Sequence, residues 1–193
     1  MKILLTGCAG FIGSNLLDYL LLDKKNFVIG VDNFSTGKLR HIKKYTSNSK
    51  FIFYEVDLKN KTHLDSIDFS NIDVVIHLAA NADVRSGLEY PSKDLEENTL
   101  VTFNVLEIAR NNKIKKFLFS STGSIYGEPS VIPTPEDAPF PVQTSLYGAS
   151  KLACEGLIQA YAEGYGIQAY IFRFVSIMGP RYSHGHVYDF YKQ

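Results

Sequence analysis

Tyr147 and Lys151 stand four residues apart in the segment LYGASK. If a helix begins at Ser145 or a neighbouring residue, this spacing places both side chains on one face, one turn apart. A phenol titrates at a pH of about 10 in water, but a nearby ammonium group and a helix N-terminus both favour its ionised form. The pair therefore indicates a general acid and base, although a half-buried tyrosine beside a surface lysine is the commoner meaning of this spacing in arbitrary sequences.

Three hydroxyl side chains precede this pair in the segment FSSTGSIYG, at Ser120, Ser121 and Thr122. They directly follow an apolar run, residues 117–119, that has the composition of a buried strand. Ligands of a parallel sheet bind at the carboxyl ends of its strands, so we expect these hydroxyls in the same site as the phenol. Thr122 would then share the proton that Tyr147 transfers.

A glycine-rich segment, TGCAGFIGSN, follows the first apolar run. Gly7, Gly10 and Gly13 allow a tight turn in which backbone N–H groups approach a pyrophosphate at the start of a helix. Such glycines also occur in ordinary turns, and their spacing is GxxGxxG instead of GxGxxG. Asp32 strengthens the interpretation, because it follows the second run about 20 positions later, where an acid that binds an adenosine ribose is expected. A carboxylate there repels a 2′-phosphate, so the expected cofactor is NAD, not NADP.

Other residues at the ends of apolar runs have weaker signals. Asp32 itself also suits an ordinary turn. Asp57 follows the third run and is as typical of a helix cap as of an adenine contact. Ala79 and Ala80 follow the fourth run, where small side chains leave room for a flat cofactor, and His77 is expected to be a hydrogen-bonded strand residue and not a base.

Apolar, β-branched runs alternate with segments of helical period along the chain. The expected strands are residues 3–5, 27–31, 51–56, 74–78, 117–119 and 169–174. The clearest helix is residues 94–111, with a stripe of Leu95, Val101, Val105, Leu106 and Ile108. This alternation predicts an α/β fold with a doubly wound parallel sheet of the Rossmann type. The proline-rich residues 128–142 are expected to form an extended surface loop.

Composition limits the classes of function. The 193 residues carry 20 basic and 20 acidic side chains, so the chain has no net charge to attract nucleic acid or an anionic membrane, and neither is an expected partner. Cys8 and Cys154 are expected to be free thiols. The apolar run at the N-terminus is too short for a signal peptide or a membrane span, so we expect a cytoplasmic protein. His184, His186 and Asp189 fit a solvated loop better than a metal site, and no metal is expected.

Together these segments resemble the extended short-chain dehydrogenase/reductases, in particular their NAD-dependent nucleotide-sugar epimerase/dehydratase branch. The matching blocks, in family order along the whole chain, are TGCAGFIGSN, VDNFSTG, VDL, HLAA, ENTLVTFNVLEIAR, SSTGSIYG, YGASK and FRFVSIMGPR. The resemblance implies that Tyr147 removes a proton from a sugar hydroxyl while hydride passes to NAD. The keto-sugar then turns over and takes the hydride back on its other face.

The resemblance also implies a role for each residue that matches a family block. The implied catalytic residues are Thr122, Tyr147 and Lys151, and the implied substrate contacts are Thr122, Tyr147 and Ser176. The implied cofactor contacts are Gly7, Gly10, Phe11, Ile12, Gly13, Asp32, Asn33, Ser35, Thr36, Gly37, Asp57, Leu58, Leu78, Ala79, Ala80, Asn98, Tyr147 and Lys151.

The residues after Thr122 narrow the implied reaction. Family dehydratases typically carry acidic residues there, whereas this chain has Gly123 and Ser124, which favours epimerisation at C4 of a UDP-sugar of the glucose/galactose type, its N-acetylated relative or the uronic acid. Ser176 stands where the family commonly has Asn, so the implied contact of this residue with the substrate does not follow from the resemblance alone. An NAD-binding module without turnover, and a reductase or dehydrogenase for another substrate, are the alternatives.

The resemblance has consequences for domains and assembly. It implies an NAD-binding domain over residues 1–175 and, over residues 176–193, the start of a truncated substrate-binding domain that is largely missing. Related proteins dimerise through two helices, here residues 94–111 and 150–165. The apolar surface of the expected homodimer would come from Leu152, Leu157, Ile158 and Tyr161.

Overall fold

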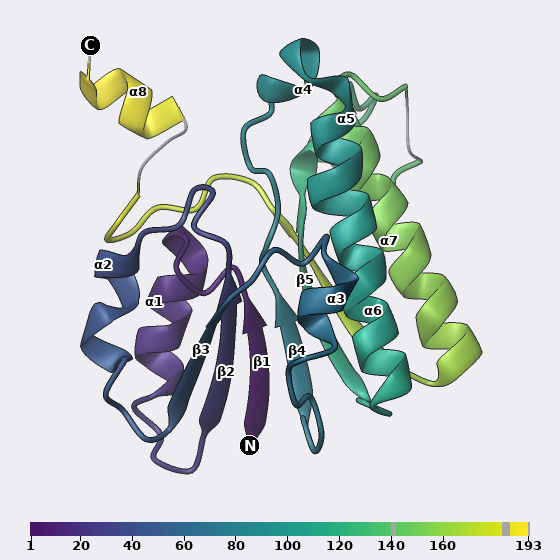
Figure 1. Cartoon of the computed structure of the whole chain (residues 1–193). Coiled ribbons are helices and arrows are strands. Elements are labelled where there is room, and N and C mark those ends of the chain that lie inside the picture. Colours follow the sequence, from purple (N-terminus) through teal and green to yellow (C-terminus); the bar gives the residue numbers. More distant parts are fainter. Residues whose placement is uncertain (140–141, 183–185, 193) are drawn as a thin grey trace.

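The chain folds around one parallel sheet with helices on both faces (Figure 1). The computed structural model describes residues 1–139, 142–182 and 186–192. The strand order is β3-β2-β1-β4-β5-β6, which confirms the predicted doubly wound sheet. The strands are β1 (Lys2–Thr6), β2 (Phe27–Asp32), β3 (Phe51–Glu55), β4 (Val74–His77), β5 (Lys116–Thr122) and β6 (Gln168–Phe174).

The helices divide between the two faces of the sheet. In Figure 1, α1 and α2 lie on one side, and α6 and α7 lie side by side on the other. The helices are α1 (Phe11–Leu20), α2 (Leu39–Ile42), α3 (Lys61–Leu64), α4 (Ser86–Glu89), α5 (Pro91–Asp94), α6 (Val101–Asn111), α7 (Leu146–Tyr165) and α8 (His186–Lys192), with 3-10 turns η1 (Lys43–Tyr45) and η3 (Gly123–Tyr126) and the π-helical η2 (Leu95–Leu100).

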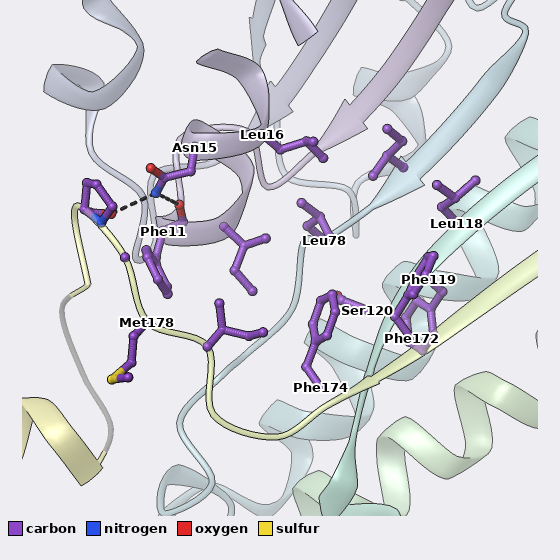
Figure 2. A pocket seen from close by; sticks show the side chains of 15 residues that line it. Phe11, Asn15, Leu16, Leu78, Leu118, Phe119, Ser120, Phe172, Phe174 and Met178 are labelled. Atoms are coloured by element: carbon purple, nitrogen blue, oxygen red, sulfur yellow. Dashed lines mark hydrogen bonds between the residues drawn. The ribbon is translucent and has the colours of Figure 1, made fainter. Parts of the chain in front are cut away.

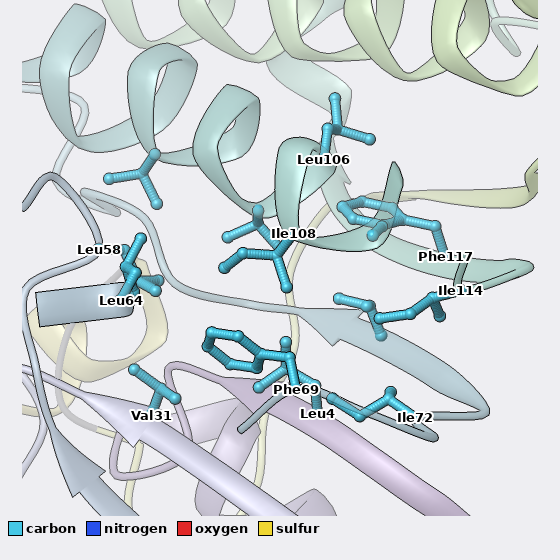
Figure 3. Packing of buried hydrophobic residues seen from close by; sticks show 14 of the residues in the cluster. Leu4, Val31, Leu58, Leu64, Phe69, Ile72, Leu106, Ile108, Ile114 and Phe117 are labelled. Atoms are coloured by element: carbon cyan, nitrogen blue, oxygen red, sulfur yellow. The ribbon is translucent and has the colours of Figure 1, made fainter. Parts of the chain in front are cut away.

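Side chains of β1 alternate between two hydrophobic cores, because successive residues of a strand point to opposite faces. Ile3 and Leu5 pack with Leu17 of α1 in one core. Leu4 belongs to the other core, which includes Leu106 of α6 (Figure 3). Both faces of the central strands are therefore buried, which explains why their sequences are almost entirely apolar.

The predicted helix over residues 94–111 is wrong at its N-terminal part. The α-helix α6 starts only at Val101, and the π-helical η2 joins it to the preceding α5. The wider turns of η2 change the direction in which side chains point. Leu95 is consequently 61% exposed and does not belong to the apolar stripe, whereas Val101 and Val105 do. The same widened turns bury Asn98.

Helix α7 begins where the sequence predicts. Ser145 is its N-cap, and its hydroxyl accepts a hydrogen bond from the backbone N–H of Gly148 at 2.9 Å. Ile158 is 1% exposed and packs in the core, so the expectation that it supplies surface for a dimer is wrong. Among the described residues, no helix has both the length and the apolar character needed to cross a membrane.

Two glycines of α7 should respond in opposite directions to alanine. Gly156 lies within the helix with open space where a Cβ would stand, so G156A should stabilise the protein by about 1 kcal/mol. Gly166 ends the helix with φ of +65°, where an alanine is strained, so G166A should destabilise it by about 1 kcal/mol. Urea unfolding of both variants is the measurement, and a G166A protein as stable as G156A would contradict the assignment of this cap.

Candidate active site

The carboxyl ends of the strands border two cavities. The larger, which we call the central cavity, has a volume of about 540 Å³ and lies between the ends of β4 and β5, the start of α7 and residues 174–177. The smaller, which we call the edge cavity, has a volume of about 50 Å³ and lies beside the end of β2. Residues from distant parts of the sequence meet at both, because the parallel strands all end at this edge of the sheet.

Most of the residues singled out in the sequence line these cavities. Those at the central cavity are Phe11, Ile12, Leu78, Ala80, Thr122, Tyr147, Lys151 and Ser176. Those at the edge cavity are Asp32, Asn33, Ser35, Thr36, Leu58, Ala79 and Ala80. Six of the residues singled out line neither cavity: Gly7, Gly10, Gly13, Gly37, Asp57 and Asn98.

A third, apolar cavity of about 460 Å³ adjoins the central cavity on the α1 side of the sheet (Figure 2). Leu118 and Phe172 of neighbouring strands face it. At its border the amide nitrogen of Asn15 donates to the carbonyl oxygens of Phe11 and Pro180, each at 2.8 Å. This link holds the segment after β6 against α1, and that segment brings Ser176 to the central cavity.

Tyr147, Thr122 and Lys151 meet at the central cavity. Thr122 lies beside Tyr147 and lowers the pKa of its phenol, while the Thr122 hydroxyl donates to the Ser124 hydroxyl at 3.2 Å. The ammonium of Lys151 donates to the carbonyl oxygen of Ser120 at 2.9 Å and lies 4.7 Å from the centre of the Phe119 ring. The arrangement places a phenol, a hydroxyl and an ammonium group on one wall, which is the set that proton transfer to and from a ligand hydroxyl requires.

Burial dominates the ionisation of this group. It raises the pKa of Tyr147, the Thr122 hydrogen bond opposes this, and the charges of Asp94 and Cys154 add to it. Burial also lowers the pKa of Lys151 to about 8. The spacing of the pair suggests that Lys151 lowers the pKa of Tyr147, but Lys151 is not among these influences. Its ammonium group is instead bonded to the end of β5.

The turn after β1 depends on two glycines. Gly7 has φ of +69°, and a Cβ on it would lie 2.8 Å from the backbone nitrogen of Ala79. A Cβ on Gly13 would lie 2.0 Å from the carbonyl oxygen of Gly7. The backbone at this turn is therefore packed too closely for a side chain at either position, and the turn leads directly into the N-terminus of α1.

Asp32 joins this turn to the end of β2. Its two carboxylate oxygens accept hydrogen bonds from the backbone N–H groups of Ala9 at 2.9 Å and Phe34 at 2.8 Å. Burial raises the pKa of Asp32, and these two bonds lower it. Asp57 differs: its carboxylate caps the following turn by accepting from the backbone N–H of Lys59 at 2.9 Å and lies on neither cavity.

His77 is a hydrogen-bonded strand residue, as its position indicates. Its ring nitrogens bond the hydroxyls of Thr6 at 2.7 Å and Thr102 at 3.0 Å. Burial, with a smaller contribution from Lys151, lowers the pKa of His77 to about 3, so the ring is neutral. The Thr6 hydroxyl also accepts the backbone N–H groups of Leu78 and Ala79, each at 3.2 Å, and thereby fixes the residues after β4.

Asn98 connects the residues after β4 to the first turn of α7. Its side-chain oxygen accepts the backbone N–H of Asn81 at 2.8 Å, and its nitrogen donates to the Ser150 hydroxyl at 2.8 Å. That hydroxyl donates in turn to the carbonyl oxygen of Tyr147 at 2.8 Å. Sequence reasoning missed Asn81, Ser150 and the buried Asp94 of this network, since a polar residue in a loop or a helix carries no signal of burial by itself.

Three residues near the C-terminus were considered as metal ligands in the sequence, and their side chains are not among those described. His184 lies outside the described residues, as do the side chains of His186 and Asp189. In the part of the chain that the structure describes, no three His, Cys, Asp or Glu side chains are grouped so that they could hold a metal ion. Cys8 and Cys154 are buried free thiols, as expected.

The comparisons with known proteins agree with one another. Residues 3–192 match the model of the NAD dependent epimerase/dehydratase family. The chain is 39% identical to a putative UDP-glucose 4-epimerase of Methanocaldococcus jannaschii, covering 93% of this chain and 57% of that protein. It is 36% identical to a UDP-glucuronate 4-epimerase of Thermodesulfobacterium geofontis, covering 92% of this chain and 56% of that protein.

Solved structures give the same result. A UDP-glucose 4-epimerase of Thermotoga maritima with UDP-glucose has a TM-score of 0.86 at 35% identity, over 97% of this chain and 60% of that chain. A UDP-glucuronic acid 4-epimerase of Bacillus cereus with UDP-glucuronic acid and NAD has a TM-score of 0.82 at 38% identity, over 94% and 58%. The chain thus spans little more than half the length of the relatives it matches.

The buried Lys151 should make stability depend on pH. Its pKa is about 8 in the folded protein against an ordinary 10.5, so between these values the unfolded chain binds more protons. The free energy of unfolding must rise with pH through this window, and a burial cost of about 3 kcal/mol acts at neutral pH. We expect K151M to be at least as stable as the wild type at pH 7 and to lose this advantage at pH 10.

Urea unfolding at the two pH values measures this difference, with the same substitution at the exposed Lys24 as control. A K151M protein whose stability relative to the wild type is identical at both pH values would contradict the burial of a charged ammonium group.

Proposed function

The chain belongs to the NAD-dependent epimerase/dehydratase family, and from this premise we propose that it binds NAD and epimerises a nucleotide sugar. The first candidate reaction is at C4 of a UDP-sugar of the glucose/galactose type. The observation that carries the proposal is the meeting of Thr122, Tyr147 and Lys151 on one wall of the central cavity. The relatives are longer than this chain, so the conversion of a nucleotide sugar by this chain is itself part of the proposal.

The residues at the sheet edge fit the cofactor. The glycine turn leaves no room for a Cβ at Gly7 or Gly13, which suits the close approach of a pyrophosphate to backbone N–H groups. Asp32, together with Asn33, Ser35 and Thr36, lines the edge cavity, where hydroxyls of an adenosine ribose would find an acceptor. We propose that residues 1–175 form this cofactor-binding domain and that residues 176–193 begin a substrate-binding part.

The side chains of the central cavity would handle the proton. Tyr147 takes it from a sugar hydroxyl, Thr122 beside the phenol shares it, and Lys151 holds positive charge on the same wall. Bound NAD would supply the acceptor, and later the donor, of the hydride. Tyr147 then returns the proton to the oxygen of the keto-sugar after the sugar has presented its other face.

One packing detail favours epimerisation over dehydration. A Cβ on Gly123 would lie 3.3 Å from a methyl carbon of Val175, which is a tight contact for a larger side chain there. Neither Gly123 nor Ser124 can supply the acid that elimination of water needs. Ser124 instead lines the central cavity, with its backbone N–H bonded to Thr122 at 3.1 Å.

We propose a second copy of the chain as the protein partner, through α6 and α7. The two helices lie side by side on one face of the sheet (Figure 1). Leu152, Leu157 and Tyr161 are partly exposed along α7, and Tyr161 packs edge-on against Phe103 of α6. We place the protein in the cytoplasm, where nucleotide sugars are made.

The cofactor assignment predicts a preference for NAD over NADP. The Asp32 carboxylate would repel a 2′-phosphate, so the wild type should bind NAD at least about tenfold more tightly than NADP. In D32N this preference should shrink, because the charge is removed while the shape is kept. Isothermal calorimetry measures both dissociation constants, and equal affinities for the two dinucleotides in the wild type would contradict the role of Asp32.

The proposed reaction predicts the effect of removing the phenol. Y147F should lower the rate of UDP-sugar interconversion by about 100- to 10,000-fold, the usual contribution of a general acid and base, and leave NAD affinity nearly unchanged. Product analysis with UDP-glucose, its N-acetylated relative and the uronic acid, under added NAD, is the measurement.

The wild-type protein decides among the alternatives in the same assay. Failure to convert any of these sugars would remove the proposed turnover and leave an NAD-binding module. Net accumulation of NADH would instead indicate a dehydrogenase, because an epimerase returns its cofactor oxidised.

A further inference from the structure

Three consecutive residues of β5 face three successive turns of α7. Thr122 lies beside Tyr147, the Ser120 carbonyl oxygen accepts from Lys151, and the Ser121 hydroxyl donates to Glu155. Tyr147, Lys151 and Glu155 are spaced by four residues, so they form one stripe along the helix. Glu155 is thus the third member of the stripe that carries the two residues assigned to catalysis, and the proposed reaction gives it no chemical step.

Glu155 is a buried carboxylate held by Arg173 and by the Ser121 hydroxyl. It is 1% exposed, and the guanidinium of Arg173 donates to it at 3.2 Å from Nε and 2.9 Å from Nη2. Arg173 lies on β6 directly beside Ser121 of β5. The ion pair of Arg173 with Glu155 therefore connects β6 to α7 next to the end of β5. A buried carboxylate is tolerated only when it is paired in this way, which makes the position of α7 depend on Arg173.

The same guanidinium reaches the proline-rich segment, residues 128–142. Arg173 donates to the phenol oxygen of Tyr126 and, at 2.6 Å, to the carbonyl oxygen of Glu136, and it lies 5.1 Å from the centre of the Tyr126 ring. The C-terminal end of the segment is held separately, where Gln143 donates to the carbonyl oxygen of Ile125 at 2.7 Å. Arg173 therefore ties the middle of the segment to α7, and the Tyr126 phenol also donates to the Glu136 carbonyl oxygen at 3.3 Å.

We propose that Arg173 and Glu155 are positioning residues for the proposed epimerase reaction, on which this inference rests. They hold α7 in register with β5 and hold the proline-rich segment beside η3, whose Gly123 and Ser124 line the central cavity. Neither side chain lines the central or the edge cavity or contacts the glycine turn. They consequently govern turnover of the sugar and not affinity for the dinucleotide.

The test compares matched substitutions in two arginine–carboxylate forks. R173K keeps the charge, but an ammonium group cannot bond the carboxylate in a fork and also reach Tyr126 and Glu136. R110K makes the same change in the fork between Arg110 and Glu107 of α6, which is outside the site, with Nε to Oε1 at 2.8 Å and Arg110 stacked on an aromatic ring. E155Q removes the charge of the carboxylate and replaces one of its two acceptor oxygens with an amide donor.

In R173K and E155Q we expect kcat to fall about 10- to 100-fold, because small displacements of catalytic groups have effects of this size. The dissociation constant for NAD should stay within about twofold of the wild type, and the pH midpoint of kcat should not move, since Glu155 is not among the groups that shift the pKa of Tyr147. Amide hydrogen exchange in the proline-rich segment should become faster. R110K should change none of these quantities.

A third variant separates the segment from the helix. Y126F removes one acceptor of Arg173 and the hydrogen bond from the Tyr126 phenol to the Glu136 carbonyl oxygen, and it leaves the fork with Glu155. We therefore expect faster exchange in the proline-rich segment and a smaller loss of kcat than in R173K. Wild-type kcat in a folded R173K protein would overturn the proposal, as would a loss of NAD affinity equal to the loss of kcat. If the wild type converts no UDP-sugar, the proposed function fails, and hydrogen exchange then decides alone: equal exchange in R173K and R110K overturns the positioning role.

Discussion

The contact between α7 and the end of β5 is the interaction on which the rest of the site depends. It brings Tyr147 to Thr122 and buries the ammonium of Lys151 against the Ser120 carbonyl oxygen. Burying that charge opposes folding, and burial lowers the pKa of Lys151 to about 8. The two hydrophobic cores, which lie on opposite faces of the same strands, must therefore offset the cost of burying Lys151.

Much of this arrangement is readable in the sequence because it follows from local rules. Apolar runs identified all six strands, and their alternation with helices predicted the parallel order of the sheet. Ser145 was recognisable as a cap, so the face shared by Tyr147 and Lys151 followed from helical spacing alone. The residues directly after each strand could be assigned to one site because parallel strands end at one edge.

What the sequence does not reveal depends on tertiary contacts. The π-helical turn that buries Asn98 and exposes Leu95 has no signature in spacing, since propensity is the same for either kind of turn. Asp57 follows a strand just as Asp32 does, yet it caps a turn, because only Asp32 faces the backbone of the glycine turn. The pairing of Glu155 with Arg173 joins a helix to a strand across 18 positions of sequence and becomes visible only in the fold.

Two buried charges on one stripe of α7 are accommodated in different ways, and the difference has a chemical meaning. Glu155 is neutralised by the fork of Arg173 and is fully engaged. Lys151 has no carboxylate within ion-pair distance among the described residues, and its one hydrogen bond is to the Ser120 carbonyl oxygen. An ammonium group has three N–H donors, and this bond uses one of them. An ion pair at Lys151 would offset part of the cost of burying its ammonium group, but it would also engage that group with a protein carboxylate. The buried carboxylate of this stripe lies instead one turn further along the helix, at Glu155.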